Sequence, residues 1–436
     1  MRNGKNALFL INHAGKAGTE RYVYTLISGA PRFGYTPFFA FNEKGLLSER
    51  IENLGVRSFQ LKMRNPYDAG AVRKLRDICQ EYNIDVVHTN YLRENYIALF
   101  VKKFFIKKLK IVHTNHFVVS NNFLVRTINR ILTPGNHRII SVCEIGAKKL
   151  KENGFAKEKI TVIHNAVDPS LWDPSAEASM YNEIRMEKRK ELGIADNETV
   201  FLCASRFAHD KGHMFYIEGI NRFFNAGNES EHEDEHESEH EGEHDCKSEG
   251  EFKSEHESGH ESGHEGEHEG EHNCTSESEF KNEHKYECEY RRNARFVLAG
   301  DGPLLEAVKG RVSALKLGDR IIFTGYMEDI RPLFYAADVY VNPSEHEALS
   351  FLILEALASG LPVIATDMGG NSDIINERSG CGILIKYGDA DTLCAALDKL
   401  FKDEAYRAGM KPQALAVIKE KFCVDLMLEK TFQTFD

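Results

Sequence analysis

Residues 342–366 read NPSEHEALSFLILEALASGLPVIAT, and this stretch decides the fold. Its apolar positions at helical spacing are Leu352, Ile353, Leu357 and Ala358. A short β-branched run, Val363–Thr366, follows Gly360 after the two residues Leu361 and Pro362. An amphipathic helix followed at once by a buried strand is typical of the units that build parallel sheets. The stretch therefore predicts an α/β fold.

The same alternation of strands and helices occurs twice along the chain. Short apolar runs bounded by turn residues are expected to be buried strands. In the first half these runs are Ala7–Ile11, Phe38–Phe41, Val86–His88, Lys110–His113, Arg138–Val142 and Ile160–His164. In the second half they are Val200–Ala204, Arg295–Ala299, Ile321–Thr324, Val339–Val341, Val363–Thr366 and Gly382–Ile385. We expect two facing, doubly wound, Rossmann-like domains with a cleft between the carboxyl ends of their sheets.

These patterns also set the expected domain boundaries. Residues 1–167 form the first domain, and residues 168–196, with two prolines and a charged helix, form a linker. Residues 197–412 form the second domain, and residues 413–436 are helices expected to cross back to the first. Within the first domain, Asp68–Glu81 predicts a helix with one apolar face.

An unusual insert, residues 229–290, interrupts the second domain between a helix and a strand. It contains 24 acidic residues, four lysines and ten histidines, and the histidines all share one four-residue phase. In a helix they would line one side and could ligate a divalent metal. Its few apolar residues cannot offset chain entropy, so we expect disorder instead.

The remaining 374 residues are mildly basic, although the whole chain of 436 residues carries a formal charge of -12. They hold 51 Lys and Arg against 43 Asp and Glu, which favours phosphate or anionic-membrane partners but is too diffuse for nucleic-acid binding. Nine cysteines without a C-x-x-C pair indicate reduced thiols. The apolar run Ala7–Ile11 is too short for a secretory signal, so we expect a cytoplasmic protein.

One basic segment suggests a contact with the inner face of a membrane. Residues 96–110 place an apolar stripe beside several lysines. The stripe consists of Ile97, Phe100, Val101, Phe104 and Phe105, and the lysines are Lys102, Lys103, Lys107 and Lys108. Such a helix can lie on anionic lipid, or it can pack on its own sheet with a solvated lysine face.

Two strand-to-helix turns carry groups suited to phosphate. Residues 14–20 read AGKAGTE, and their glycines let backbone N–H groups approach an anion, although such turns also serve packing alone. Residues 204–213 read ASRFAHDKGH, in which Arg206 supplies a planar fork and Lys211 a point charge. Their place at the end of a strand favours diphosphate binding over two solvated loop cations.

Two glutamates in residues 342–366 are candidates for contacts with hydroxyl groups. Glu347 precedes the predicted helix, and Glu355 lies within it after seven intervening residues. A carboxylate in an apolar helix is costly to bury unless it meets donors, and sugar hydroxyls are such donors. The spacing alone is common by chance, so the inference depends on the surrounding sequence.

Taken together, these segments resemble the retaining glycosyltransferases of family 4, the group 1 type, which have the GT-B fold. The matching segments are AGTE (17–20), VIHNAVD (162–168), SRFAHDKG (205–212), LAGDGP (298–303), FTGY (323–326), ADVYVNPS (337–344) and the E-x7-E pair. The resemblance covers the chain except the insert.

The resemblance implies roles for individual residues. Arg206 and Lys211 would hold the diphosphate of a nucleotide sugar, Glu347 the hydroxyls of the transferred sugar, and Glu355 the ribose. Donor contacts are further assigned to Gly18, on the phosphate or acceptor side, to Gly325, near the base, and to Leu349 and Ser350. His116 would contact the sugar from the first domain, or is a loop histidine satisfied by nearby backbone.

The implied reaction is transfer with retention of configuration to a carbohydrate or lipid-linked acceptor, in synthesis of cell-surface polysaccharide or glycoconjugate. The cations would stabilise charge growing on the departing diphosphate, so no metal or other cofactor is expected. Asp389-Ala390-Asp391 spells the metal-binding D-x-D pattern, but it precedes an apolar helix and is interpreted as a helix cap.

Two departures from the family pattern put the donor's identity in doubt. Ala17 stands where a second glycine is usual, and Ala348 stands where a glycine often follows the first glutamate. Two alternative functions remain: a same-fold nucleotide-sugar epimerase or phosphorylase, and a non-enzymatic metal-binding protein acting through the histidine repeat.

Overall fold

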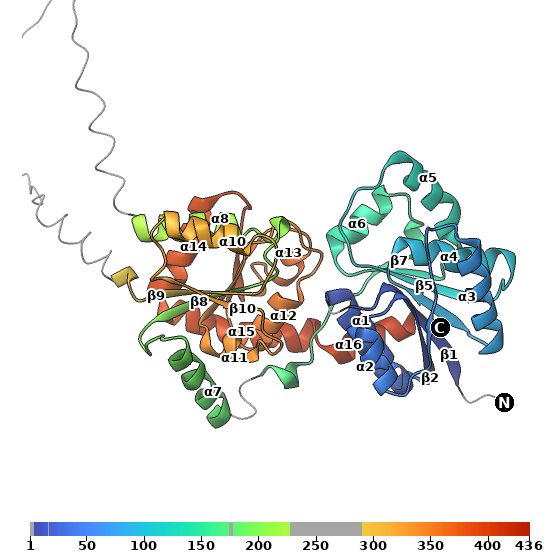
Figure 1. Cartoon of the computed structure of the whole chain (residues 1–436), viewed down its shortest axis with the longest axis horizontal. Helices are drawn as coiled ribbons and strands as arrows, with labels where there is room; N and C mark the ends of the chain where they lie inside the picture. The colour runs from blue at the N-terminus through green and yellow to red at the C-terminus, as the bar shows by residue number, and fades with distance from the viewer. Residues whose placement is uncertain (1–3, 16, 174–177, 227–289) are drawn as a thin grey trace, which may run out of the picture. The chain divides into compact units, whose positions relative to one another are not determined.

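A computed structural model describes residues 4–15, 17–173, 178–226 and 290–436. Both of its sheets belong to one compact unit, formed by residues 1–223 and 294–436 (Figure 1). The insert predicted at residues 229–290 lies outside the described residues except for Tyr290, so its histidine repeat and the expected disorder are not tested.

The first sheet has seven parallel strands in the order β3-β2-β1-β4-β5-β6-β7. The strands are β1 (Lys5–His13), β2 (Tyr35–Glu43), β3 (Ser58–Gln60), β4 (Val86–Thr89), β5 (Lys110–Asn115), β6 (Arg138–Ser141) and β7 (Ile160–Val162). The helices between them are α1 (Gly18–Gly29), α2 (Leu46–Asn53), α3 (Ala69–Glu81), α4 (Leu92–Phe104), α5 (Phe123–Leu132) and α6 (Glu144–Glu152). Six of these strands were predicted, and β3 was not.

Alternate residues of β1 explain why this sheet is covered on both faces. Phe9 and Ile11 pack in a core with α1, α2 and the last helix, α16 (Val424–Gln433). Leu8 and Leu10 point to the other face and pack with α3 and α4. Both faces of a parallel sheet are buried in this way, which is why its strands read as continuous apolar runs.

The second sheet has six parallel strands in the order β10-β9-β8-β11-β12-β13. They are β8 (Thr199–Ala204), β9 (Ala294–Ala299), β10 (Ile321–Gly325), β11 (Val339–Asn342), β12 (Val363–Thr366) and β13 (Gly382–Ile385). Helices cover both faces (Figure 1): α8 (His213–Asn225), α10 (Leu305–Ala314) and α14 (Ala390–Lys402) on one, and α11 (Arg331–Ala336), α12 (Phe351–Ala358) and α15 (Glu404–Lys421) on the other. The short helix α13 (Asn371–Ile374) follows β12. The two parallel-sheet α/β domains confirm the predicted fold class.

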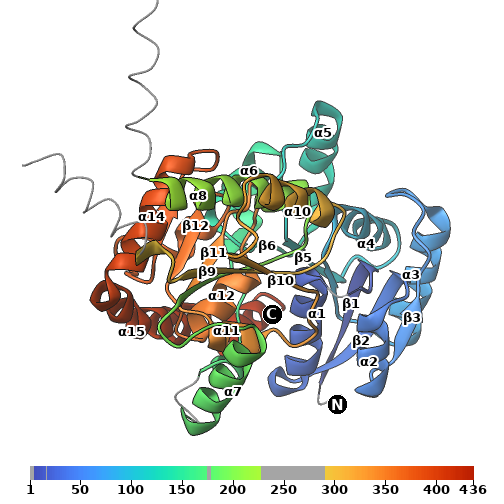
Figure 2. The same cartoon turned by 60° about the vertical axis from the view of Figure 1, so that its left-hand side comes forward.

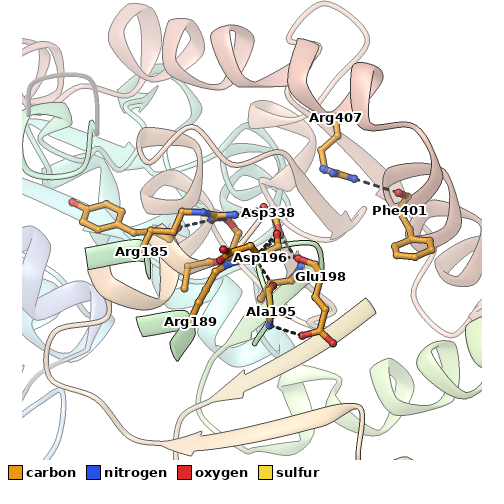
Figure 3. A network of polar contacts seen from close by, with 12 residues as sticks. Arg185, Arg189, Ala195, Asp196, Glu198, Asp338, Phe401 and Arg407 are labelled. Atoms are coloured by element: carbon orange, nitrogen blue, oxygen red, sulfur yellow. Dashed lines mark hydrogen bonds and ion pairs between the residues drawn. The ribbon is translucent and has the colours of Figure 1, made fainter. Parts of the chain in front are cut away.

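The helix of the linker segment, α7 (Ala178–Glu191), is held against the second domain by two arginines that share the Asp338 carboxylate and also donate to backbone carbonyls (Figure 3). Arg185 Nη2 lies 2.7 Å from Asp338 Oδ1, and Arg189 Nη2 lies 2.8 Å from Asp338 Oδ2. Arg189 is 3% exposed and also donates to the carbonyls of Ala336, Ala195, Asp196 and Glu198. Every N–H direction of this buried guanidinium therefore has an acceptor.

Of the two alternatives for residues 96–110, packing on the protein's own sheet is confirmed for part of the stripe. The expected extent of the helix is wrong, because α4 ends at Phe104 and Lys107 and Lys108 lie beyond it. Ile97 and Val101 are fully buried in the core under α4, because the helix covers the sheet with its apolar face. Phe104 and Phe105, at the end of the helix, stay exposed beside Lys103.

We expect that residues 229–289 can be replaced by a short Gly/Ser loop without loss of folding. The two ends to be joined are already bonded, since Arg291 Nη1 donates to the carbonyl of Ala226 at 2.6 Å. Loop length changes stability only slowly, so the midpoint of thermal unfolding should stay close to that of the full chain. A non-cooperative unfolding transition in the shortened protein would show that the repeat contributes to the fold.

Candidate active site

The predicted donor residues of the second domain follow the carboxyl ends of three strands. Arg206 and Lys211 follow β8, Gly325 ends β10, and Glu347, Leu349 and Ser350 follow β11. Strands β8 and β11 are neighbours in the sheet, so the segments that follow them lie side by side. Ligands of open α/β sheets bind at this edge.

An ion pair joins two of these residues. Lys211 Nζ lies 2.8 Å from Glu347 Oε1, and both side chains are largely shielded from solvent. Ser344 Oγ donates to the same carboxylate oxygen at 3.0 Å. Asp210 adds a second carboxylate, 3.5 Å from Lys211 Nζ. The structure thus brings Lys211 and Glu347 together although 135 residues separate them in the sequence.

Backbone contacts hold the two segments in this position. The N–H groups of Glu345 and His346 donate to the carbonyl of Asp210. Gly212 has φ +68°, and a Cβ there would lie 1.9 Å from the carbonyl oxygen of Pro343. A glycine is therefore required, because any side chain would push the two segments apart.

The segment after β12 also makes a close backbone contact with the segment that carries Glu347. Gly369, after β12, has φ +60°, and a Cβ there would lie 1.8 Å from the carbonyl oxygen of Glu347. The next residue, Gly370, donates its N–H to the carbonyl of Ala348 at 2.6 Å. The backbone around Glu347 is thus fixed from both sides.

Arg206 differs from its neighbours because it is exposed. Across the described ranges, no carboxylate lies within 4.0 Å of its guanidinium. Its five N–H donors are available to an anion, as binding a diphosphate requires.

Glu355 has a partner that the sequence interpretation missed. Its carboxylate, 3% exposed, forms an ion pair with Arg21 of α1. The guanidinium of Arg21 also lies 5.2 Å from the ring centre of Phe351, and burial lowers its pKa to about 10. Arg21 directly follows the AGTE segment, and this position next to a phosphate-binding turn was the available signal.

The remaining donor residues occupy different surroundings. A Cβ built on Gly18 would lie 3.1 Å from the ring of Phe351, so this turn reaches the helix that carries Glu355. Leu349 is buried and its carbonyl accepts from Asn165, while Ser350 is the N-cap of α12. A Cβ on Gly325 would meet no atom within 4 Å, so the space beside it is open.

His116 lies at the end of β5 and is buried. Its Nε2 is 3.1 Å from Asn90 Oδ1, and its ring packs edge-on against Tyr22. Burial, with His113 nearby, lowers its pKa to about 3. The imidazole is therefore neutral at physiological pH and has a side-chain partner already.

Two further expectations concern local backbone. Asp389 Oδ1 accepts from the N–H of Thr392, so the interpretation of the D-x-D pattern as a helix cap is confirmed. Ala17 is the N-cap of α1 with φ -85° and ψ -173°, a conformation that any residue adopts. The missing glycine at this position therefore causes no backbone strain.

Sequence models of two families match this chain. The model described as Glycosyl transferases group 1 matches residues 282–403, and the one described as Glycosyltransferase Family 4 matches residues 17–171. A similar characterised protein is N-acetyl-alpha-D-glucosaminyl L-malate synthase of Bacillus anthracis. It is 21% identical over 379 residues, which cover 84% of this chain and 78% of that protein.

Solved structures have a fold similar to that of this chain. A glycosyltransferase from Rickettsia africae has a TM-score of 0.75 and 19% identity, covering 100% of this chain and 98% of that one. HepE of Anabaena, solved in complex with UDP, has a TM-score of 0.72 and 18% identity, covering 98% of this chain and 99% of that one. These likenesses establish a GT-B fold.

Proposed function

Because the chain belongs to the group 1 and family 4 glycosyltransferases, we propose that it transfers a hexose with retention of configuration, in the synthesis of a polysaccharide or glycoconjugate. The donor is a nucleotide diphosphate sugar, and the acceptor is a carbohydrate or glycolipid. The observation that carries this proposal is the Lys211–Glu347 pair, formed between segments that follow adjacent strands, with the exposed Arg206 in one of those segments.

In the proposed reaction, the bond between the sugar C1 and the diphosphate oxygen breaks while an acceptor oxygen bonds to C1 on the same face. Arg206 and Lys211 stabilise the negative charge that grows on the departing diphosphate. Glu347, held by Lys211 and Ser344, orients the sugar through its hydroxyls. The departing phosphate oxygen accepts the acceptor's proton, so the reaction needs no separate base. Because Arg206 and Lys211 neutralise the charge of the leaving diphosphate, the proposed reaction needs no metal.

The test is to incubate the purified protein with UDP-, GDP- and ADP-hexoses and measure nucleotide release in buffer with and without EDTA. We expect release from one donor class, unchanged by EDTA, and a product with the donor's anomeric configuration by NMR. No release from any donor would contradict the proposed donor class, and an inverted product would contradict the mechanism.

We also propose that the protein contacts an anionic membrane surface, through α5 rather than through α4. Phe123 is 80% exposed, and Leu124 and Ile131 are each 66% exposed. Helix α5 lies beside α6 in both views (Figures 1 and 2). At the end of α6, a hydrogen bond from Lys149 and the charges of Lys148 and Arg126 lower the pKa of the Glu152 carboxyl, so cations of both helices lie near it. Exposed apolar residues flanked by cations suit the interface of an anionic bilayer. Within the described residues, no helix combines the length and apolarity needed to cross a membrane.

Changing Phe123 and Leu124 together to glutamate should abolish flotation with phosphatidylglycerol vesicles. The change removes the apolar side chains that the bilayer would bury, and it adds negative charge that the anionic lipid repels. The matched control changes Phe104 and Phe105, the exposed aromatic residues at the end of α4, to glutamate. We expect this control to float like the wild type. Loss of flotation in the control alone would show that the membrane contact is made by the end of α4. Absence of flotation for the wild-type protein would contradict the proposal.

A further inference from the structure

A cavity of about 550 Å³ lies at the carboxyl ends of β2 and β3, and none of the donor residues of the second domain lines it. Its lining residues are Asn42, Glu43, Lys44, Gln60, Lys62, Met63, Arg64 and Arg93. Asn42 and Glu43 end β2, Gln60 ends β3, and Arg93 lies in the first turn of α4. The cavity is therefore at the edge of the first sheet where α/β folds bind their ligands.

The lining is strongly cationic. Four lysines and arginines face one carboxylate, Glu43, which is 3.2 Å from His13 Nδ1. For Lys44, Lys62 and Arg64, no ion pair within 4.0 Å occurs among the residues that the structure describes. The nearby Asp68 caps α3, accepting from the N–H groups of Gly70 and Ala71. Asp68 also accepts from the N–H of Arg64 at 3.1 Å and attracts the Arg64 side chain. The lining still holds more cations than carboxylates, which favours an anionic ligand.

Arg93 is held in place by the surrounding backbone and amides. Its Nη1 donates to the carbonyl of Met63 at 2.9 Å and to Asn12 Oδ1 at 3.2 Å. Asn42 connects the same groups, donating to Asn12 Oδ1 and accepting from the N–H of Met63 at 2.7 Å. The remaining N–H groups of this oriented guanidinium can form the paired bonds that phosphate oxygens accept.

One wall of the cavity joins the turn that leads to Gly18. The N–H of Ala14 donates to the carbonyl of Glu43 at 3.0 Å, and the N–H of Leu47 donates to the carbonyl of Ala14 at 3.0 Å. Backbone hydrogen bonds thus connect the lining residue Glu43 to the segment that leads to Gly18, where a Cβ would approach Phe351 of the donor-side helix.

We propose that this cavity binds a phosphate group of the acceptor, an inference that rests on the proposed transferase function. One carboxylate would neutralise a single cation, whereas a phosphate monoester or diphosphate can meet Arg93 and the rim charges of Lys62 and Arg64 together. The phosphate can belong to a lipid-linked diphosphate or to a soluble phosphosugar. The acceptor is therefore an anionic, phosphorylated molecule.

The test uses two probes, farnesyl diphosphate for the lipid source and glucose 1-phosphate for the soluble one. Hydrogen exchange of peptides covering residues 61–68 reports binding at this cavity and not at the donor site. We expect one probe to protect these peptides in the wild type, and stronger protection by one of them identifies the source. Absence of protection by both probes would overturn the proposal.

Three variants test whether the protecting probe binds at this cavity. Lys62→Ala combined with Arg64→Ala changes two exposed side chains, so the protein should fold, and the protecting probe should bind at least tenfold more weakly. Glu43→Gln, at the same rim, should bind it no more weakly than the wild type. Arg206→Ala should keep the protection. Unchanged binding by the double variant would refute the assignment, whereas protection without any nucleotide release would count against the transferase function alone.

Discussion

Replacement of Arg206 by alanine should lower turnover by about 10²-fold or more, even at saturating donor. The charge that Arg206 stabilises grows as the diphosphate departs, so the loss falls on the chemical step and not on binding alone. Glu347→Gln keeps the size of the side chain but weakens its pairing with Lys211, and it should impair transfer more than nucleotide binding. Both are measured as steady-state nucleotide release on the identified donor.

The controls separate a role in the reaction from a role in folding. Arg378→Ala removes another exposed arginine of the second domain and should leave turnover unchanged. Glu355→Ala, which deprives Arg21 of its partner, should instead weaken binding of the free nucleotide, because the ribose is part of donor and product alike. If Arg206→Ala and Glu347→Gln both keep near-normal turnover while folded, the proposed site is wrong.

Replacement of Arg189 by alanine should lower the free energy of unfolding by about 3–5 kcal/mol, because it breaks a buried ion pair on one side only. Asp338 would keep Arg185 and the N–H of Val200, but four carbonyls would lose the guanidinium (Figure 3). Denaturant unfolding followed by circular dichroism measures this. Lys190→Ala, an exposed neighbour in the same helix, should change stability by less than about 0.5 kcal/mol. Equal small effects of both changes would show that α7 contributes little to the fold.

The fold was predictable because each buried strand is a short apolar run between turn residues. Val363–Thr366 and Gly382–Ile385 were predicted with the bounds that the structure gives. The strand β3 escaped because Ser58–Gln60 has three half-buried or exposed residues with a single aromatic among them. A hydrophobic pattern detects strands whose side chains are buried, and the side chains of this edge strand are only partly buried.

Helix α4 shows a second limit of the hydrophobic pattern, which concerns what an apolar face contacts. Its apolar residues indicated a helix, but the expected segment, residues 96–110, is displaced from the observed Leu92–Phe104. Periodicity also cannot say whether an apolar face meets the protein's own sheet or a partner. Ile97 and Val101 face the core, whereas the exposed apolar side chains of α5 begin at Phe123.

Within the site, the residues that follow strand ends could be located from local sequence. Lys211 and Glu347 were assigned to one donor site through the family resemblance, and the adjacency of β8 and β11 explains why they meet. The pairing of Arg21 with Glu355 could not be predicted, because no local pattern connects side chains from such distant segments. The cationic cavity was missed for the same reason, since its cations come from two loops and a helix.

The close backbone contacts at Gly212 and Gly369 also limit how this protein can be redesigned. The segments after β8, β11 and β12 interlock where no side chain fits, so each has a shape that depends on the other two. If one of these segments were replaced by that of another transferase, its different backbone would clash with the two remaining segments. A change of sugar preference is therefore accessible through single side chains on an unaltered backbone, or through exchange of all three segments as one set.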